Sequence, residues 1–166
     1  MAGIGQSKDI LGTNNADQRE KIVNLLTVAY WMEIETVMNY IQASTNLDGI
    51  RAEEISESLS EDIQEELGHA QRFAQRIKDL YGTVPGSADF SAEQRSLQPP
   101  KKSTDVVSVI KGVMEAEKGG IEHYNKLIEE CEGVDWVTQD MVIEILQDEQ
   151  NHYRTFESFL MEFEDK

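Results

Sequence analysis

The sequence predicts an all-α protein, a four-helix bundle with a long crossover between the second and third helices. Four stretches place apolar side chains three and four residues apart, which is the spacing of one helix face, and almost no stretch alternates like a strand. All three prolines fall between the second and third stretches, in residues 82–104. This segment is therefore expected to be a long loop, which a simple up-and-down bundle would not need.

The first helix is expected over about residues 17–44 and the second over about residues 52–81. Helices of this length would each be roughly 40 Å long at about 1.5 Å per residue. Gly82 follows the second helix and is predicted to take the left-handed conformation that often ends a helix. The apolar face of the first helix consists of Ile22, Leu25, Leu26, Ala29 and Ile34.

The third helix is expected to begin near Thr104 or Asp105, because an acidic residue is favoured in the first turn, and to end near Cys131. The fourth should start after Asp135 and continue to about Phe163. These boundaries leave little chain outside the four helices and the crossover. The bundle is therefore expected to form one domain.

A chain of 166 residues is long enough for one hydrophobic core and short for two. We expect residues 17–165 to form the bundle domain and residues 1–16 an N-terminal extension without the features of a secretory signal. No apolar run approaches the roughly 18 residues of a membrane span. Cys131 is the only cysteine, so no intrachain disulfide is possible, and a cytoplasmic location is expected.

The formal net charge of -17 argues against nucleic acid as a partner, because binding to phosphates is driven by Lys and Arg. Such acidity suits a surface or cavity that attracts cations. A solvated surface whose charges repel one another, without any metal site, would have the same net charge. Net charge alone therefore does not decide between a cation-binding protein and an acidic protein without a metal function.

Two of the three histidines follow a glutamate by three residues, on well separated segments. Glu66 precedes His69 in "EELGHAQ", and Glu149 precedes His152 in "DEQNHYR". The two pairs are 83 residues apart. Residues three apart on a helix share a face, so each pair can point together into the bundle.

The other two helices repeat at nearly the same distance. Glu33 and Tyr40 match Glu117 and Tyr124 with an offset of 84 residues, whereas the neighbouring Glu35 has Gly119 at that offset. Glu115, two residues before Glu117, has Trp31 at the corresponding earlier position. Neither Glu35 nor Glu115 is therefore repeated in the other half of the chain. The repeat thus selects one inward glutamate per helix.

Together these positions supply four carboxylates and two imidazoles, enough for two divalent metal ions with bridging carboxylates. A Glu from each of two helices and Glu-x-x-His from each of the other two is the known pattern of di-iron and di-manganese bundle proteins. Oxygen and imidazole ligands without thiolate suit iron, with manganese as the alternative. The predicted metal and catalytic residues are Glu33, Glu66, His69, Glu117, Glu149 and His152.

Five other residues near the predicted ligands are interpreted separately. Tyr40 and Tyr124 are expected to be core-packing residues. His123 has no repeat partner and is expected at the surface. The adjacent Gly119 and Gly120 each cost roughly 1 kcal/mol in a helix relative to alanine. They indicate either close helix packing or a local bulge that lets Glu117 change its coordination.

Over nearly the whole chain after about residue 17, the sequence resembles the bacterioferritin and Dps-like branches of the ferritin superfamily. "DWVTQDMVIEILQDEQNH" is similar to the last-helix ligand segment of bacterioferritins, and "LQPPKKSTDVVSVIKGVMEAE" looks like the third-helix start of Dps-like ferritins. The resemblance implies oxidation of Fe(II) at a di-iron site inside the bundle. It also implies that Glu65 and Asp148 orient the imidazole on the opposite helix.

Two departures from the family bear on cofactors. Bacterioferritins hold haem with a methionine directly after the second-helix glutamate, and this chain has Leu67 there, so no haem is expected. Some Dps-like ferritins have a cysteine pair near the iron site, but Cys131 stands alone and is expected to be a small packing residue.

The leading hypothesis is therefore a ferroxidase that oxidises ferrous iron with O2 or H2O2, takes up two iron ions per subunit, and stores the product in a protein cage. One alternative is a di-iron or di-manganese peroxidase or catalase of the rubrerythrin type, without mineral storage. A third is an acidic helical interaction protein with a structural metal. Mineral accumulation, peroxide turnover alone, or neither would distinguish the three.

A homo-oligomer of 12 subunits is expected, with a 24-subunit cage or a dimer as alternatives. Cages of 24 bacterioferritin-like subunits add a fifth helix, and only 14 residues follow His152 in this chain. The polar, glycine-containing N-terminal extension is of the kind that Dps-like proteins use at subunit contacts.

Overall fold

The computed structural model describes residues 9–164, and over that range the chain is all-helical, as predicted. Residues 1–8 of the expected N-terminal extension, and residues 165–166, lie outside the described range. No helix in the described part is long and apolar enough to cross a membrane. The four long helices are α1 (Ala16–Asn46), α2 (Ala52–Asp79), α3 (Val106–Cys131) and α4 (Trp136–Glu164), with short 3-10 turns at Thr13–Asn15 and Ser87–Asp89.

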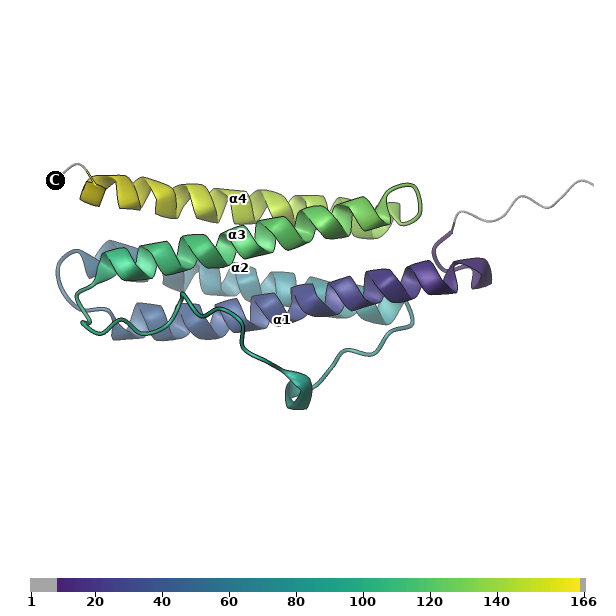
Figure 1. Ribbon diagram of the computed structural model, residues 1–166, viewed down its shortest axis with the longest axis horizontal. Helices are drawn as coiled ribbons and strands as arrows, with labels where there is room; N and C mark the ends of the chain where they lie inside the picture. The colour runs from purple at the N-terminus through teal and green to yellow at the C-terminus, as the bar shows by residue number, and fades with distance from the viewer. Residues whose placement is uncertain (1–8, 165–166) are drawn as a thin grey trace, which may run out of the picture.

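The helices form two hairpins, α1 with α2 and α3 with α4, which pack side by side along the bundle (Figure 1). Because α2 and α3 run in the same direction, residues 80–105 must travel the full length of the bundle between them (Figure 1). This is the predicted long crossover. The observed helix ends differ from the predicted ones by two residues or fewer.

Acidic caps begin the second hairpin. The Asp105 carboxylate accepts a hydrogen bond from the Ser108 amide at 3.1 Å, and the Asp135 carboxylate accepts one from the Thr138 amide at 3.0 Å. Each satisfies an amide that has no partner within its helix, which stabilises a helix by roughly 1 kcal/mol. These caps explain why α3 and α4 start where the sequence predicts.

The end of α2 corrects one prediction. Tyr81, not Gly82, is the left-handed residue, with φ of 64°. The Gly82 amide donates to the Ile77 carbonyl at 2.8 Å, and a Cβ at Gly82 would lie 2.8 Å from Cγ1 of Val23. The glycine is therefore needed for close approach to α1, while Tyr81 makes the turn with its ring under the Arg19 guanidinium.

Two apolar clusters fill the bundle, one toward each end. Ile22, Leu26, Phe73 and Tyr124 belong to the first, which lies toward the α3–α4 turn. The second lies toward the α1–α2 turn and includes Leu59, Ile110 and Phe156, with Tyr40. Between them, buried acidic and imidazole side chains form a polar layer.

The crossover is bound to the bundle and does not hang free. The buried Glu35 carboxylate accepts hydrogen bonds from the Glu93 and Gln94 amides, both at 2.8 Å. On α3, a Cβ at Gly112 would lie 2.6 Å from the Ser96 carbonyl oxygen, so the loop rests directly on the helix backbone there. Residues 93–97 therefore cover the face that α1 and α3 present together.

The paired glycines of α3 do not produce a bulge. Residues 106–131 form a continuous α-helix, so the proposed distortion beside Glu117 is absent. Close packing does not demand the glycines either. A Cβ at Gly119 would meet only Cε of Met32, at 3.8 Å, and one at Gly120 would lie 3.7 Å from the nearest side-chain atoms.

Candidate metal centre

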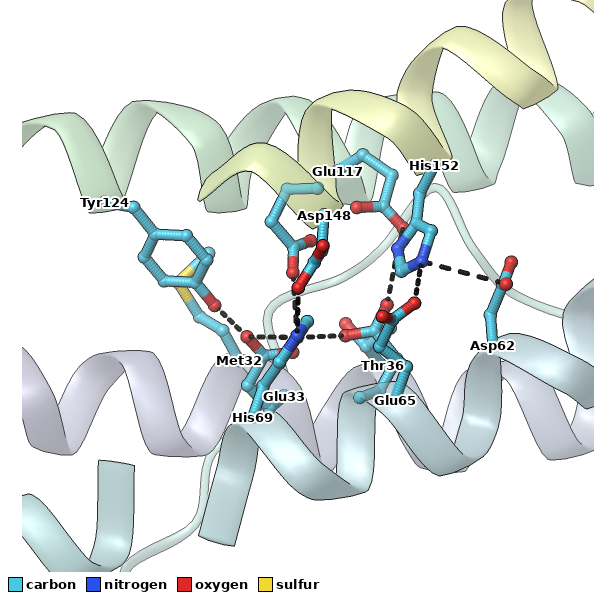
Figure 2. Close-up of polar contacts among 12 residues, drawn as sticks. Met32, Glu33, Thr36, Asp62, Glu65, His69, Glu117, Tyr124, Asp148 and His152 are labelled. Carbon is cyan, nitrogen blue, oxygen red and sulfur yellow. Dashed lines mark hydrogen bonds and ion pairs between the residues drawn. The ribbon is translucent and has the colours of Figure 1, made fainter. Parts of the chain in front are cut away.

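All six predicted ligands lie buried in the polar layer at the middle of the bundle. Each of these residues is at most 6% exposed. Figure 2 shows Glu33, His69, Glu117 and His152 of this set. Every helix contributes: α1 and α3 one glutamate each, and α2 and α4 one glutamate and one histidine each. The three-residue spacing on α2 and α4 turns each Glu–His pair toward the same interior space.

The ligand atoms fall into two overlapping groups of four, and within each group all of them lie within 4.8 Å of one another. Glu66 and Glu149 belong to both groups. Such a geometry can hold two cations, with Glu66 and Glu149 placed to bridge them. The first group is Glu33, Glu66, His69 and Glu149, and the second is Glu66, Glu117, Glu149 and His152.

Both imidazoles turn Nδ1 toward the centre. Nδ1 of His69 lies 3.1 Å from Oε1 of Glu149 and 3.6 Å from Oε2 of Glu66. Nδ1 of His152 lies 3.0 Å from Oε1 of Glu66. Nδ1 is therefore the nitrogen available to a metal ion in each ring.

The other ring nitrogen faces an acid on the opposite helix. Nε2 of His69 lies 3.2 Å from Oδ2 of Asp148, and Nε2 of His152 lies 2.9 Å from Oε2 of Glu65. These are the two acids to which the resemblance assigns an orienting role. Asp62, which sequence reasoning missed, approaches Nε2 of His152 to 3.7 Å. Contacts of this kind fix the tautomer and the direction of a ligating imidazole.

Six buried polar atoms of the centre have no hydrogen-bond partner in the described structure. Unsatisfied buried polar groups are rare in proteins and cost about 1–3 kcal/mol each. All six point into the same small volume, and all belong to predicted ligands, so two cations would satisfy them together. They are Oε1 and Oε2 of Glu66, Nδ1 of His69, Oε2 of Glu117, Oε1 of Glu149 and Nδ1 of His152.

Without cations, protons must balance the charge of these carboxylates. Burial would lower the pKa of His69, but the Glu149 and Glu66 carboxylates outweigh it and raise the pKa to about 10. Burial likewise opposes the shift of His152, and Glu66 and Asp62 raise its pKa to about 10. Both imidazoles are therefore protonated at neutral pH in the metal-free centre.

The pKa values of Glu33, Glu66 and Glu117 do not shift in the same direction. Burial and the negative charges of Glu149 and Glu66 raise the pKa of Glu33 and Glu117 well above the usual range. Burial also acts to raise the pKa of Glu66, but His152 and His69 outweigh it and hold this pKa below its usual range. The central Glu66 therefore loses its proton more readily than an ordinary carboxyl group, whereas the outer Glu33 and Glu117 lose theirs less readily.

The two tyrosines do more than pack. Tyr40 of α1 donates to Oε1 of Glu117 on α3. Tyr124 of α3 donates to Oε1 of Glu33 on α1 (Figure 2). Both rings are also fully buried in the apolar clusters, as expected. Each hydroxyl fixes one ligand carboxylate from across the bundle. The seven-residue Glu–Tyr spacing places both on one helix face and is the signal for this role.

Other polar residues lie outside the centre. Glu35 and Glu115, which the repeat sets aside, belong to neither group of candidate ligands among the described residues. His123 corrects a prediction: it is half-buried, with Nε2 2.9 Å from the Leu25 carbonyl oxygen. Cys131 is buried in the first apolar cluster, and burial raises its pKa to about 12, as suits a packing residue.

Comparison with known proteins places the chain in a family. The bacterioferritin of Desulfovibrio desulfuricans is 25% identical over 87% of this chain and 77% of its own length. A DNA protection during starvation protein of Pyrococcus furiosus is 27% identical over 85% and 77%. The solved D. desulfuricans structure, with its diiron site, superimposes with a TM-score of 0.77 at 23% identity, covering 93% of this chain and 86% of its own.

A second solved structure, the dodecameric thioferritin of Bacteroides fragilis, gives a TM-score of 0.75 at 20% identity, and the match covers 89% of this chain and 88% of that one. These likenesses agree with the all-helical bundle described above. The ferritin-like domain family matches residues 23–165, a range that includes all six candidate ligands, and the chain belongs to that family.

Proposed function

We propose that the chain is a ferroxidase and iron-storage protein, which binds two Fe(II) ions at Glu33, Glu66, His69, Glu117, Glu149 and His152 and oxidises them. The observation that carries the proposal is the set of six buried ligand atoms without a hydrogen-bond partner, on residues that fall into two groups sharing Glu66 and Glu149. The similarity to a bacterioferritin and to a DNA protection during starvation protein supports the same activity.

The residues fit the chemistry of ferrous iron. Four carboxylates balance the charge of two divalent cations, and carboxylate with imidazole is a ligand set suited to iron or manganese. Each Fe(II) gives up one electron, and the pair reduces one O2 to H2O2 or one H2O2 to water. Anionic ligands stabilise the more highly charged ferric product. Tyr40 and Tyr124 hold the outer carboxylates in place while the charge changes.

Replacement of the two shared carboxylates tests the centre. Glu66→Ala and Glu149→Ala should each slow Fe(II) oxidation about a hundredfold or more, because each carboxylate serves both cation positions. Glu122→Ala removes an exposed glutamate of α3 and should keep the parent rate. The measurement is stopped-flow absorbance of the ferric product, with circular dichroism to show that the helices still form.

Parent-like oxidation in both variants would show that the centre lies elsewhere. Prolonged loading of the parent protein with Fe(II) then distinguishes storage from peroxidase activity. Retention of several hundred iron ions per assembly supports storage, because a mineral stays in solution only inside an enclosed volume. Peroxide turnover without retained iron would indicate a peroxidase instead. Metal analysis of protein purified without added metal would reveal a native manganese centre.

We also propose that the chain assembles into a closed shell of 12 copies. The fold-level likeness to a dodecameric thioferritin supports this size. Exposed apolar side chains at the start of α4 support an interface: Trp136 is 67% exposed, Val137 63% and Ile143 49%. Apolar groups clustered in this way on a surface mark contact sites between proteins.

A further inference from the structure

A cavity of about 430 Å³ lies between α1, α3 and the crossover. It is on the side of the bundle from which Glu33 and Glu117 enter the centre. Residues 93–97 cover it from outside, anchored through the Glu35 carboxylate. The cavity is therefore built into the fold next to the metal centre by a segment that has a defined position.

Residues adjacent to the ligands form the inner wall of this cavity. Met32 precedes Glu33 on α1, and Ala116 precedes Glu117 on α3; both line the cavity, as does Gly119. Figure 2 shows Met32 beside Glu33 and Tyr124. None of these three residues carries a charge, and the methionine is flexible enough to move aside. Five charged residues line other parts of the cavity, but most of its lining surface is apolar; they are Glu35, Asp89, Glu93, Arg95 and Glu115.

The presence of a glycine at position 119, inside a regular helix, indicates that the thin inner wall has a function. Glycine within a helix costs about 1 kcal/mol relative to alanine, and nothing in the packing or in the helix geometry requires it here. A Cβ at this position would make only an ordinary contact with Met32. What the glycine does achieve is to keep the wall thin, because any longer side chain would extend into the cavity toward Met32.

The opposite side of the centre has a different character. There, Asp148 and Glu65 face the outer nitrogens of the two imidazoles, with Asp62 beside them. Carboxylates attract cations and are poor surroundings for an apolar molecule. The two sides of the centre thus differ: carboxylates lie against the imidazoles on this side, whereas Met32, Ala116 and Gly119 separate the centre from the cavity on the other.

We propose that the cavity is the access chamber for dioxygen, and that dioxygen passes to the centre between Met32 and Gly119. This assignment rests on the proposed ferroxidase function. A small, neutral, apolar molecule partitions into an uncharged wall that a hydrated Fe(II) ion would not cross. Dioxygen therefore reaches the two metal positions from the α1–α3 side.

Filling the chamber tests the assignment. Gly119→Leu should raise the O2 concentration for half-maximal Fe(II) oxidation about fivefold or more, with little change in the rate at saturating O2. Gly68→Leu is the matched control, because it makes the same change on α2 next to His69, where an added Cβ meets nothing. Anaerobic calorimetry should show that both variants bind Fe(II) as the parent does.

A second readout does not depend on oxidation. Xenon occupies apolar cavities and reports on them in the metal-free protein. Xenon NMR should show a saturable shift in the parent and in Gly68→Leu that Gly119→Leu loses. If Gly119→Leu fails to fold, Met32→Ala replaces it, and the thinner wall should lower the half-maximal O2 concentration.

An unchanged O2 dependence in the folded chamber variant overturns the assignment. A parent that oxidises Fe(II) with peroxide but not with O2 also overturns it, while leaving the ferroxidase function in place. If the parent oxidises Fe(II) with neither oxidant, the proposed function itself fails. In that case the xenon measurement still decides whether the cavity admits an apolar gas.

Discussion

The two imidazoles of the centre hold protons that a metal ion must displace. With their pKa raised to about 10, His69 and His152 are charged at pH 7 when the centre is metal-free, yet only neutral imidazole can ligate. Metal uptake at pH 7 should therefore release about two protons per subunit, one from each imidazole. Calorimetry in buffers of different ionisation enthalpy counts the protons released.

The stability of the metal-free protein depends on pH through these two histidines. Between the usual histidine pKa of about 6.5 and the raised value of about 10, the metal-free folded state holds protons that the unfolded chain has lost. The stability that they contribute is fully present below the lower value and is lost as the pH rises through the upper one. Apparent metal affinity should rise over the same interval. Uptake without proton release would contradict these assignments.

Glu35 is not repeated in the second half of the chain and is not a predicted ligand, but it binds the crossover. Its carboxylate holds the Glu93 and Gln94 amides. Glu35→Ala should remove that acceptor and speed hydrogen exchange of these two amides on the order of tenfold, because hydrogen bonds to charged groups contribute about 1.5–3 kcal/mol. Glu35→Gln keeps one acceptor oxygen and should show a smaller increase. Equal exchange in all three proteins would show that the loop is held by other contacts.

Spacing along the sequence identified the residues that the structure brings together in the centre. It worked because both the Glu–x–x–His pairs and the 84-residue offset follow from helix periodicity and from the match between the two hairpins. Their role as ligands remains a prediction. Partners from other helices, such as Tyr124 for Glu33, or Asp62 for His152, could not be assigned because periodicity gives a face and not its neighbours.

At the scale of elements, the four helices were predictable because each repeats its apolar side chains over many turns, and because Asp105 and Asp135 mark two starts. The crossover was predictable only as a loop. Its path depends on non-local contacts, such as that between Ser96 and Gly112, which no local pattern encodes. The cavity under it was missed for the same reason. Tyr81 took the left-handed turn because Gly82 was needed for close packing on α1.

The α3–α4 turn is joined to α2 by a buried ion pair. Arg76 donates to Asp135 and to Thr138, both at 2.7 Å, and all three side chains are buried. Asp135→Ala should lower the free energy of unfolding by about 3–5 kcal/mol, because it removes the cap of α4 and leaves the guanidinium unpaired. Chemical denaturation measures the loss.

The double variant Arg76→Met with Asp135→Ala separates the two causes. Removing both charges should recover most of the loss, since a buried pair often contributes little beyond an apolar replacement. The lost cap should leave a deficit of roughly 1 kcal/mol. A double variant no more stable than Asp135→Ala would show that the unpaired charge is not the main cost.

At the scale of the whole molecule, assembly must overcome repulsion between chains that each carry a formal net charge of -17. A closed shell of such chains requires apolar contact at its interfaces and benefits from salt, which screens exposed charges beyond about 10 Å at 0.1 M. We therefore expect a species near 12 × 18.8 kDa by light scattering at physiological salt, with smaller species at low salt.

A substitution in the apolar start of α4 tests the proposed shell. Trp136→Glu should shift the protein to smaller species, because it puts a charge into the proposed contact, while an acid in the first turn of α4 leaves the helix itself stable. Gln64→Glu adds the same charge at an exposed position of α2 and should leave the shell intact. A stable dimer of the parent at physiological salt would contradict the shell and the storage role with it. Fe(II) oxidation by such a dimer would then be a property of the single bundle.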